Sequence, residues 1–462
     1  MKRKTFINSL VHIAVMLSFI FLISLNSCGS QNNNPNIILI MADDLGYGDV
    51  SCYNPESLIQ TPNIDQLAKE GIRFTDAHSP SSVCSPTRYG LLTGRNAWRT
   101  WLKKYALNGY APPMLEEGRE TIASLLKKNG YKTGCIGKWH IGLEWKVKEG
   151  SDIDFWKPLD WSFEYIKEVS ENVDYSKSVG YGPADFGFDY FFGTSGCSTT
   201  DPPYVFIEND KTVGIPSVML PEDMAGDPGY MIPDWNHKIV DGVFVSKAKE
   251  FINENLNDPF FVYLSLSAPH APHLPPDNLN GKSGVGLRED MVLWVDQSVG
   301  EIIKTLEQND LTGNTLIIVT SDNGPLPGSE GHSSSAGFRS YKASIYEGGH
   351  RVPFIARWPG KIKSNSTNDD AICLTDMIAT FADLTETKLS TDMGEDSHNI
   401  LPLLLGKDFN KPLREAMVLH SGDGTFAIRQ GEWKFIEYKS ENIGSFYGEL
   451  YYLKNDPAEK NN

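Results

Sequence analysis

The sequence NIILIM at residues 36–41 runs directly into the acidic pair Asp43 and Asp44. Its apolar residues are continuous rather than alternating, which is typical of a strand in a parallel sheet that is covered on both faces. Outward from this run, other apolar runs alternate with segments of helical periodicity along the chain. We therefore expect an α/β fold in which a large, mostly parallel sheet lies between layers of helices.

Three further apolar runs also end in polar or charged residues. They are residues 133–137, followed by Lys138 and His140; residues 260–266, followed by His270; and residues 315–320, followed by Asp322 and Asn323. Because ligands of open α/β sheets bind at the carboxyl ends of the strands, we expect these side chains to meet at one edge of the sheet. Each one alone has an ordinary explanation as a helix cap, a turn or a structural histidine. Their repetition at four strand ends is what indicates a site.

The acidic and amide side chains at these strand ends form an oxygen-only donor set. Its members are Asp43, Asp44, Asp322 and Asn323. Carboxylate and amide oxygens suit a hard cation such as Ca²⁺ or Mg²⁺ better than they suit zinc. The sequence therefore predicts a site for a hard divalent cation at this edge of the sheet.

Helix signals lie between the strands. The expected helices follow Thr61 and stop at Gly71, cover residues 121–129, and present an apolar face at residues 291–306. In the first of them, a proline at the first helical position and a glycine after the last mark the two ends. These helices contribute to the layers that a sheet with two apolar faces requires.

The composition fits a globular protein and excludes several other classes. The 462 residues are 40% hydrophobic, and 42 Lys and Arg stand against 59 Asp and Glu, for a formal charge of −17. Disordered, collagen-like and coiled-coil chains are excluded by this composition. No nucleic-acid partner is expected, because phosphate contacts need clustered Lys and Arg. An anionic substrate would have to be held by a local cationic site, since more distant charges are screened.

The N-terminus has the features of an export signal. Basic residues at 2–4 precede an apolar stretch at 7–25 and the sequence LNSC, which ends at Cys28 and resembles a bacterial lipobox. We expect residues 1–27 to be a lipoprotein signal peptide, Cys28 to carry a lipid anchor to the membrane, and residues 28–35 to form a tether. An ordinary signal peptide and an uncleaved anchor are the alternatives. In each case the protein is exported, and the lipobox indicates a periplasmic or outer-membrane-anchored lipoprotein of a Gram-negative bacterium.

Four other cysteines have spacings that fit no zinc pattern. They are Cys52, Cys135, Cys197 and Cys373. Export permits disulfides, and four cysteines allow three complete pairings between which the sequence does not choose. We expect these cysteines to be buried and unpaired.

The segment SVCSPTRYGLLTGR at residues 82–95 combines a cysteine with a predicted helix start. Pro86 suits the first turn of this helix and Gly94 suits its end. Cys84 is expected just before the N-terminus, where backbone N–H groups favour an anion, with Arg88 four residues on and on the same side. The alternatives are a small buried cysteine beside a salt-bridging arginine, and the nucleophile of a thiolate hydrolase.

The sequence CSPTR followed by LLTGR resembles the maturation and active-site signature of the type I, formylglycine-dependent sulfatases. Further blocks match this arylsulfatase-like family in collinear order over most of the chain. They are GKWHIG at 137–142, APHAP at 268–272, SDNG at 321–324, YKASIYEGGHRVP at 341–353 and ELYYLKNDPAEKNN at 449–462. The resemblance implies an α/β fold of the alkaline phosphatase superfamily, with a small antiparallel sheet in a C-terminal subdomain.

The resemblance also implies that a maturase converts Cys84 to formylglycine after synthesis, and that the hydrated aldehyde is the nucleophile. The oxygen-only donor set then corresponds to the calcium ligands of the family, so that calcium is expected rather than magnesium. The implied reaction is hydrolysis of sulfate esters, and the expected substrate is a sulfated sugar or glycan of the galactose or N-acetylgalactosamine type. A phosphoester or phosphonate hydrolase of the same superfamily and a non-catalytic sulfoglycan-binding lipoprotein are the alternatives.

The other matched positions take their expected roles from the family. Arg88 would steady the formylglycine, and Lys138 and Lys342 correspond to the lysines that bind sulfate. His270, together with Lys342, would assist departure of the alcohol. His140 resembles the base that deprotonates the second hydroxyl, expels sulfate and restores the aldehyde. Such a cluster of cations suits the charge that a sulfate ester spreads over three oxygens.

Three features depart from the family pattern. Thr87 stands where Ser or Ala is more usual, but the Cys-x-Pro-x-Arg frame is intact. His273 forms a second His-x-Pro, and we assign the leaving-group role to His270 because Ala-Pro precedes it; His273 is left as a candidate substrate contact. Relatives usually continue beyond the position of Asn462, which leaves a truncated C-terminal subdomain as one expectation.

The chain divides into two expected domains after the tether. They are a sulfatase catalytic domain at residues 36–405 and a small α+β subdomain at residues 415–462, with an antiparallel sheet and a packed helix. Residues 144–235 are irregular, and long loops over a strand-end site usually carry specificity. Four tryptophans of this segment are expected either to stack on a sugar ring or to belong to the core. They are Trp145, Trp156, Trp161 and Trp235.

Overall fold

A computed structural model describes residues 34–407, 412–439 and 446–462 of the protein. The expected signal peptide at residues 1–27 and the expected lipid anchor at Cys28 lie outside the described residues. Within the described ranges, no helix combines the length and the apolar character needed to cross a membrane.

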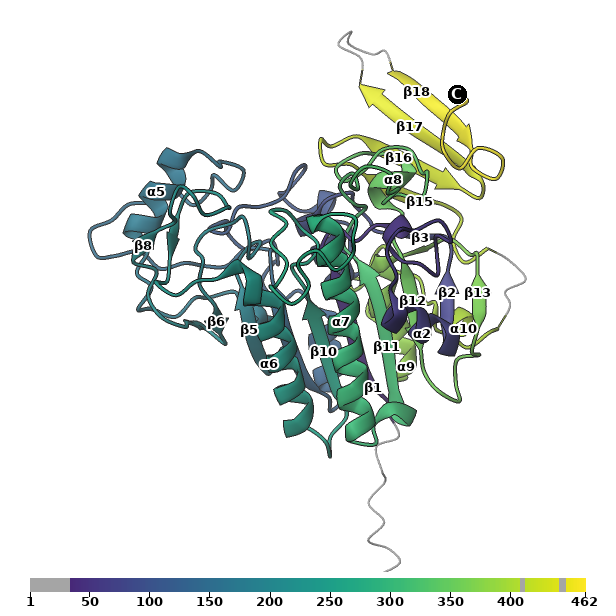
Figure 1. Ribbon diagram of the computed structural model, residues 1–462, viewed down its shortest axis with the longest axis horizontal. Helices are drawn as coiled ribbons and strands as arrows, with labels where there is room; N and C mark the ends of the chain where they lie inside the picture. The colour runs from purple at the N-terminus through teal and green to yellow at the C-terminus, as the bar shows by residue number, and fades with distance from the viewer. Residues whose placement is uncertain (1–33, 408–411, 440–445) are drawn as a thin grey trace, which may run out of the picture. The chain divides into compact units, whose positions relative to one another are not determined.

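A ten-stranded sheet organises the fold from residue 36 onward (Figure 1). Its strand order is β13-β2-β12-β11-β1-β10-β4-β5-β6-β7. The bounds are β1 (Asn36–Ala42), β2 (Ile72–Phe74), β4 (Lys132–Lys138), β5 (Tyr190–Thr194), β6 (Ile207–Glu208), β7 (Lys211–Thr212), β10 (Phe260–Ser265), β11 (Thr315–Ser321), β12 (Phe354–Arg357) and β13 (Ser366–Asn368). The strands β11, β1, β10, β4 and β5 are parallel to their neighbours, whereas β12 and β6 are antiparallel on either side. Two small sheets pair β3 (Ala77–His78) with β14 (Ile372–Cys373) and β8 (Val218–Met219) with β9 (Tyr230–Met231).

The position of β1 inside the sheet explains why its sequence is a continuous apolar run. It is paired on both sides, with β10 and with β11, and all of its residues are buried. Ile37, Leu39 and Met41 belong to one hydrophobic core, and Ile38 and Ile40 belong to the other. Alternating side chains of a strand point to opposite faces, so β1 contributes to two cores at once. The prediction of a mostly parallel sheet that is covered on both faces is confirmed.

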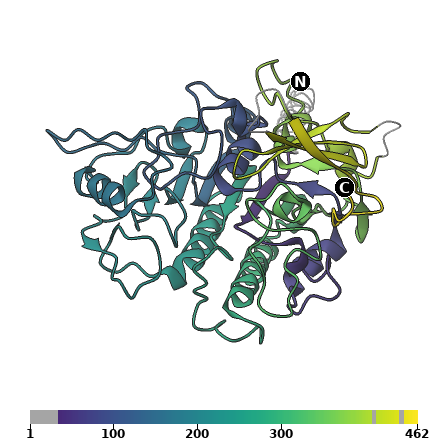
Figure 2. The same cartoon turned by 90° about the horizontal axis from the view of Figure 1, so that it is seen from above.

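Helices cover the two faces of the sheet (Figures 1 and 2). Buried side chains place α2, α6 and α7 on one core and α3, α4, α9 and α10 on the other. The bounds are α2 (Pro62–Glu70), α3 (Cys84–Thr93), α4 (Ile122–Lys128), α5 (Phe163–Asn172), α6 (Val240–Glu254), α7 (Leu287–Gln308), α8 (Glu347–His350), α9 (Met377–Leu384) and α10 (Leu401–Leu404). The three predicted helices correspond to α2, α4 and α7. The Thr121 hydroxyl caps α4 by accepting a hydrogen bond from the backbone N–H of Ser124.

A separate four-stranded antiparallel sheet follows near the C-terminus, drawn in yellow in Figure 1. Its strands are β15 (Met417–His420), β16 (Phe426–Gln430), β17 (Trp433–Lys439) and β18 (Phe446–Tyr452), paired in that order. The expected antiparallel sheet is therefore present, but residues 412–439 and 446–462 contain no helix beside it. The inner face of this sheet is covered instead by the segment around α8, since Ile345 shares a core with Ala427 and Ile436.

Buried charges join this C-terminal sheet to the loop after β2 and to α8. The guanidinium of Arg429 on β16 donates to both carboxylate oxygens of Asp76, at 2.6 and 2.5 Å. The ammonium of Lys434 on β17 lies 3.0 Å from Glu347 Oε1 and 2.8 Å from Glu459 Oε1. Lys434, Glu347 and Glu459 have no exposed surface. The C-terminal sheet is thus held to the rest of the fold by ion pairs that are shielded from water.

Candidate functional site

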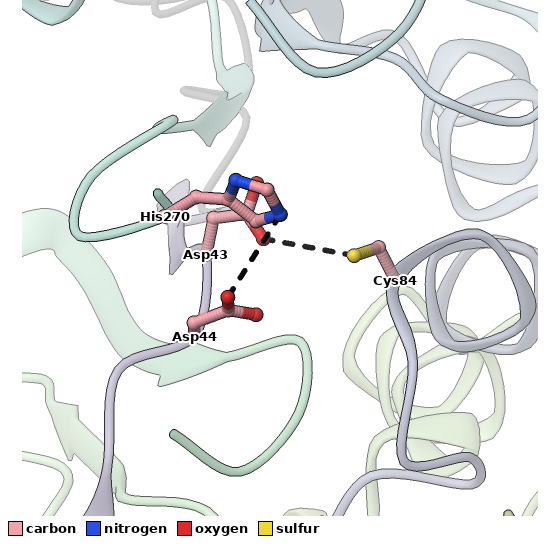
Figure 3. Close-up of side chains that lie close together, drawn as sticks. All are labelled: Asp43, Asp44, Cys84 and His270. Carbon is pink, nitrogen blue, oxygen red and sulfur yellow. Dashed lines mark hydrogen bonds and ion pairs between the residues drawn. The ribbon is translucent and has the colours of Figure 1, made fainter. Parts of the chain in front are cut away.

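The predicted site residues lie at the carboxyl ends of the parallel strands. Asp43 and Asp44 follow β1, Asp322 and Asn323 follow β11, Lys138 ends β4, His140 follows it, and His270 lies beyond β10. The helix α3 adds Cys84 as its first residue, and Figure 3 shows Cys84 facing Asp43 while His270 lies beside the aspartate pair. Cys84, Asp43, Asp44 and His270 each offer an atom within 4.8 Å of the others. Side chains from two strand ends and one helix start therefore meet at one point.

The loop after β1 is held in a strained conformation. Asp44 has a φ of 66°, a left-handed value that residues other than glycine rarely adopt. Its backbone N–H donates to Asp322 Oδ1 at 3.2 Å, and the N–H of Asp43 donates to the Ala268 carbonyl at 3.0 Å. Strain of this kind persists only where the surroundings fix it, and it is common at functional sites. The loops after β10 and β11 thus fix both carboxylates.

The oxygen-only donor set fits a hard cation. Asp43, Asp44, Asp322 and Asn323 are all buried. The Asn323 amide donates through Nδ2 to Asp44 Oδ1 at 2.7 Å, and its Oδ1 finds no hydrogen-bond partner among the described residues. Burial and the negative charge of Asp43 raise the pKa of Asp322 to about 6, although Arg88 opposes the shift. A divalent cation would reduce the repulsion between the carboxylates and would give the unpartnered amide oxygen of Asn323 a partner.

Three cations face these carboxylates, of which Arg88 and Lys138 are buried and Lys342 is partly buried. Lys138 Nζ lies 2.5 Å from Asp43 Oδ2, Lys342 Nζ lies 2.7 Å from Asp44 Oδ1, and Arg88 Nη2 lies 2.7 Å from Asp322 Oδ2. Burial alone would raise the pKa of Asp43, but charges led by Lys138 hold it well below its usual value. The chain therefore places three cations at this edge of the sheet, against its overall negative charge.

The approach of Lys138 depends on a glycine. Gly137, the residue before it on β4, has a φ of 115°, and a Cβ there would lie 1.8 Å from the Ser265 carbonyl oxygen of β10. The guanidinium of Arg88 donates to the carbonyl of Lys138 at 3.2 Å. Because β4 and β10 can approach closely at Gly137, the end of β4 brings Lys138 to the carboxylate cluster that Arg88 reaches from α3.

Cys84 lies deep in the site rather than just before the helix. It is the first residue of α3, it is 2% exposed, and its Sγ lies 3.7 Å from Asp43 Oδ1. Burial raises the pKa of the Cys84 thiol well above its ordinary value, although Lys138 and Lys342 oppose the shift. The unmodified thiol is therefore protonated at neutral pH and a poor nucleophile, which weighs against a thiolate hydrolase.

His140 is oriented by backbone and by a carboxylate. Its φ is 55°, again a left-handed value, and its Nε2 lies 2.7 Å from the Leu107 carbonyl and 3.3 Å from Asp201 Oδ2. Its Nδ1 is buried without a hydrogen-bond partner in the described part of the chain. Burial and the charge of Lys138 hold the pKa of His140 well below its usual value. A neutral ring with a free Nδ1 can accept a proton there.

His270 is the cationic counterpart of His140. Its Nε2 lies 3.9 Å from Asp44 Oδ2, and its Nδ1 lies 3.3 Å from the Sγ of Cys197. Burial lowers the pKa of His270, but negative charges led by Cys197 more than offset this and raise it to about 9. In turn, the charge of His270 brings the pKa of the Cys197 thiol well below its usual value, against the effect of burial. His270 is thus protonated at neutral pH and can donate a proton.

Two residues that contact these histidines were not found by sequence reasoning. Cys197 and Asp201 lie in the loop after β5, within the segment that we expected to be irregular. The backbone N–H of Cys197 donates to Asp201 Oδ2 at 2.7 Å, so the two residues form one unit. The rule that ligands bind at the carboxyl ends of strands would have found them, had the short strand β5 been recognised.

The four tryptophans of residues 144–235 and His273 differ in how far they are exposed to solvent. Trp145 and Trp235 are each 5% exposed, and both donate hydrogen bonds inside the protein, so these two tryptophans belong to the core. Trp156 and Trp161 are 66% and 39% exposed and remain available to a ligand. His273 is partly buried, with an Nε2 that has no partner within the described ranges.

The cysteines are unpaired as expected, but Cys52 is only partly buried, contrary to the prediction. All five in the described residues are unpaired, and four of them are buried. They are Cys52, Cys84, Cys135, Cys197 and Cys373. The expectation of unpaired cysteines is therefore confirmed for this part of the chain.

Comparison with known proteins places the chain in a family. Residues 35–387 match the sulfatase family, and residues 338–462 match the family described as N-sulphoglucosamine sulphohydrolase, C-terminal. The chain is 34% identical to an N-acetylgalactosamine-6-O-sulfatase of Bacteroides thetaiotaomicron, over 94% of this chain and 90% of that protein. It is 29% identical to the N-acetylgalactosamine-6-sulfatase of Homo sapiens, over 87% of this chain and 71% of that protein.

Solved structures agree with this placement. A structure from a study of glycosaminoglycan metabolism by Bacteroides thetaiotaomicron, labelled BT33336S-sulf, aligns with a TM-score of 0.80 at 32% identity. The alignment covers 93% of this chain and 95% of that one. The chain therefore belongs to the sulfatase family, with the alkaline phosphatase-like fold, and it is a sulfuric ester hydrolase.

Proposed function

We propose that the protein removes sulfate from a sulfated glycan, at a galactose or N-acetylgalactosamine unit, by means of a formylglycine made from Cys84 and a bound calcium ion. The observation that carries this proposal is the meeting of Cys84, the oxygen-only donor set and three cations at one edge of the sheet. The names of the two N-acetylgalactosamine sulfatases to which the chain is similar support the choice of sugar.

The cations of the site would bind the sulfate group. A sulfate ester spreads its charge over three oxygens, and preorganised ammonium groups in a water-excluded site stabilise that charge strongly. Lys138 is buried, Lys342 is partly buried, and the two are already oriented by Asp43 and Asp44. Calcium, when bound by the oxygen-only donor set, would supply Lewis-acid stabilisation of the transferring group. Arg88, paired with Asp322, holds that part of the site rigid.

A hydrated formylglycine at position 84 would carry two hydroxyls on one carbon, at the start of α3. One of the two hydroxyls would give its proton to the carboxylate of Asp43, whose Oδ1 lies 3.7 Å from the Cys84 sulfur. Its oxygen would then attack sulfur and displace the sugar, whose oxygen would take a proton from His270. Lys342 lies beside the same aspartate as His270 and stabilises the departing oxygen. His140 then accepts the proton of the second hydroxyl at its free Nδ1, and the electrons of that O–H bond restore the carbonyl and expel sulfate.

Peptide mass spectrometry tests the proposal directly. The protein is produced together with a sulfatase-maturing enzyme, and the tryptic peptide of residues 74–88 is analysed. We expect position 84 to carry the aldehyde in place of the thiol. A thiol at position 84, in a host that converts a control sulfatase, would contradict the mechanism. Rates on the sulfate and phosphate esters of one sugar then separate a sulfatase from a phosphoester hydrolase of the same superfamily.

Calcium removal is expected to inactivate and destabilise the protein. A chelator should lower the melting temperature, and calcium should restore it more effectively than magnesium, because Ca²⁺ accepts oxygen ligands in irregular geometry whereas Mg²⁺ requires a nearly octahedral set. The Asn323→Leu variant removes the orphaned amide oxygen and should bind calcium at least about 10-fold more weakly. Asn278→Leu changes an exposed asparagine and is the matched control. If the melting temperature of the wild type were the same with and without calcium, the prediction of a calcium site would be wrong.

We also propose that the protein is exported as a lipoprotein anchored through Cys28 and is served by a formylglycine-generating maturase. The lipobox-like sequence LNSC supports the anchor. The burial of Cys84 in the folded protein supports modification of the chain before it folds. Fractionation of cells that express the full chain tests the location.

A further inference from the structure

The loop after β5 holds the loop after β10 through three consecutive side chains. Cys197 Sγ lies 3.3 Å from His270 Nδ1, Ser198 Oγ lies 2.7 Å from Ser267 Oγ, and Thr199 Oγ1 donates to the Ala271 carbonyl at 3.0 Å. All three residues of the β5 loop are buried. Two loops that follow the strands on either side of β4 are therefore joined side chain by side chain at the edge of the site.

The backbone of the His270 loop is fixed independently of Cys197. Asp241 in the first turn of α6 accepts hydrogen bonds from the backbone N–H groups of Ser267 and Ala268, at 2.8 and 2.7 Å. The N–H of His270 itself donates to the Ser267 carbonyl at 3.0 Å. These contacts hold the main chain, whereas Cys197 is the residue of the β5 loop that contacts the imidazole ring.

We propose that Cys197 is a positioning residue that holds the imidazole of His270 by its Nδ1 and so directs Nε2 at the leaving oxygen of the substrate. The Nδ1 has two partners, the Ala271 carbonyl at 2.5 Å and the Cys197 sulfur at 3.3 Å. Two partners on one nitrogen restrict rotation of the ring and keep a proton on Nδ1. The Nε2 then points into the site, 3.9 Å from Asp44 Oδ2. This inference rests on the proposed function, in which His270 protonates the leaving alcohol.

The step that depends on this geometry is departure of the sugar. As the oxygen on residue 84 bonds to sulfur, the bond between sulfur and the sugar oxygen breaks, and its electron pair takes the Nε2 proton of His270. The ring is left neutral, with its proton on Nδ1. A sugar alkoxide is a poor leaving group and needs an aligned acid, whereas a nitrophenolate leaves without a proton. The two kinds of ester therefore report separately on the position of His270.

The test compares two substrates across three variants of the matured protein. Cys197→Ala should lower kcat on a sulfated N-acetylgalactosamine by about 10- to 100-fold, because a small misplacement of an acid is costly. On 4-nitrophenyl sulfate the same variant should lose no more than about threefold. Cys197→Ser should recover part of the loss, since its hydroxyl can also interact with Nδ1. Ser198→Ala breaks a contact of the same β5 loop without touching the ring, and it should change both substrates by the same small factor.

Equal losses on the two substrates would overturn the inference, because they would show that Cys197 only supports the fold. Unchanged rates on both would overturn it as well. A crystal structure of Cys197→Ala gives a second readout that does not depend on turnover: we expect the His270 ring to rotate away from Asp44, and an unmoved ring contradicts the proposal. A matured wild type that releases sulfate from neither ester would instead refute the proposed function.

Discussion

The Cys84→Ala variant is expected to release sulfate from a sulfated sugar at least about 10⁴-fold more slowly than the matured wild type, as kcat/KM. Alanine cannot be converted to an aldehyde, so the variant has no oxygen that can attack sulfur at this position. The fold should survive, because Cys84 starts a helix and makes only a 3.7 Å contact with Asp43. The measurement is sulfate release by ion chromatography, with circular dichroism as the check on folding.

The matched control is Cys135→Ala, which removes an equally buried thiol from β4. That variant should keep nearly all of its activity, since Cys135 belongs to the hydrophobic core. Cys84→Ala should still bind the substrate, because Lys138 and Lys342 remain in place. Sulfate release within about 100-fold of the wild-type rate would show that another group is the nucleophile.

The Lys434→Met variant is expected to lose about 3–5 kcal/mol in the free energy of unfolding. Its ammonium is fully buried between Glu347 and Glu459, and it also lies 3.0 Å from His350 Nε2. The charge of Lys434 opposes burial and holds the pKa of Glu347 well below its usual value. Without Lys434, the buried Glu459 would lose its cation, and Glu347 would keep its 3.1 Å ion pair with Arg351 but lose the one with Lys434. Urea denaturation, followed by tryptophan fluorescence, measures the loss.

Lys238→Met provides the comparison for an exposed ion pair. Lys238 Nζ lies 2.8 Å from Asp277 Oδ1, but the two side chains are 43% and 87% exposed. Water and salt screen such a pair, so its removal should barely change the unfolding midpoint. If Lys434→Met and Lys238→Met proved equally mild, the C-terminal sheet would have to be held by its apolar contacts rather than by the buried ion pairs.

The central strands could be predicted because a continuous apolar run indicates a strand that is buried on both faces. A run such as residues 36–41 is apolar on both faces only where both faces are covered, and the polar residues after it must then emerge at the strand end. The strand β5 gives a weaker signal, because it is short, aromatic and interrupted by Gly193. Its recognition depends on its pairing with β4, which lies far away in the sequence, and no local sequence pattern indicates that contact. Cys197 and Asp201 were missed for that reason.

Exposure at the rim of the site was the other property that local sequence could not supply. Trp145 and Trp156 lie in the same irregular segment and have the same side chain, yet one is buried and the other is exposed. The difference arises from packing against distant residues, such as the contact of Trp145 with Tyr110 and Tyr175. The prediction of a helix in the C-terminal part was wrong for a similar reason, because the cover for that sheet comes from Ile345 and the segment around α8, far earlier in the chain.

The position of β1 in the sheet has a consequence for the order of folding. This strand is made first, yet its two partners β10 and β11 begin only at Phe260 and Thr315. Contacts between such distant segments form slowly, and an unpaired apolar strand is prone to aggregate until they do. The same delay leaves the segment around Cys84 without its final surroundings while most of the chain is still being made. The topology therefore has two effects on the nascent chain. It raises the risk of aggregation, and it leaves Cys84 accessible to a modifying enzyme before the finished fold buries it.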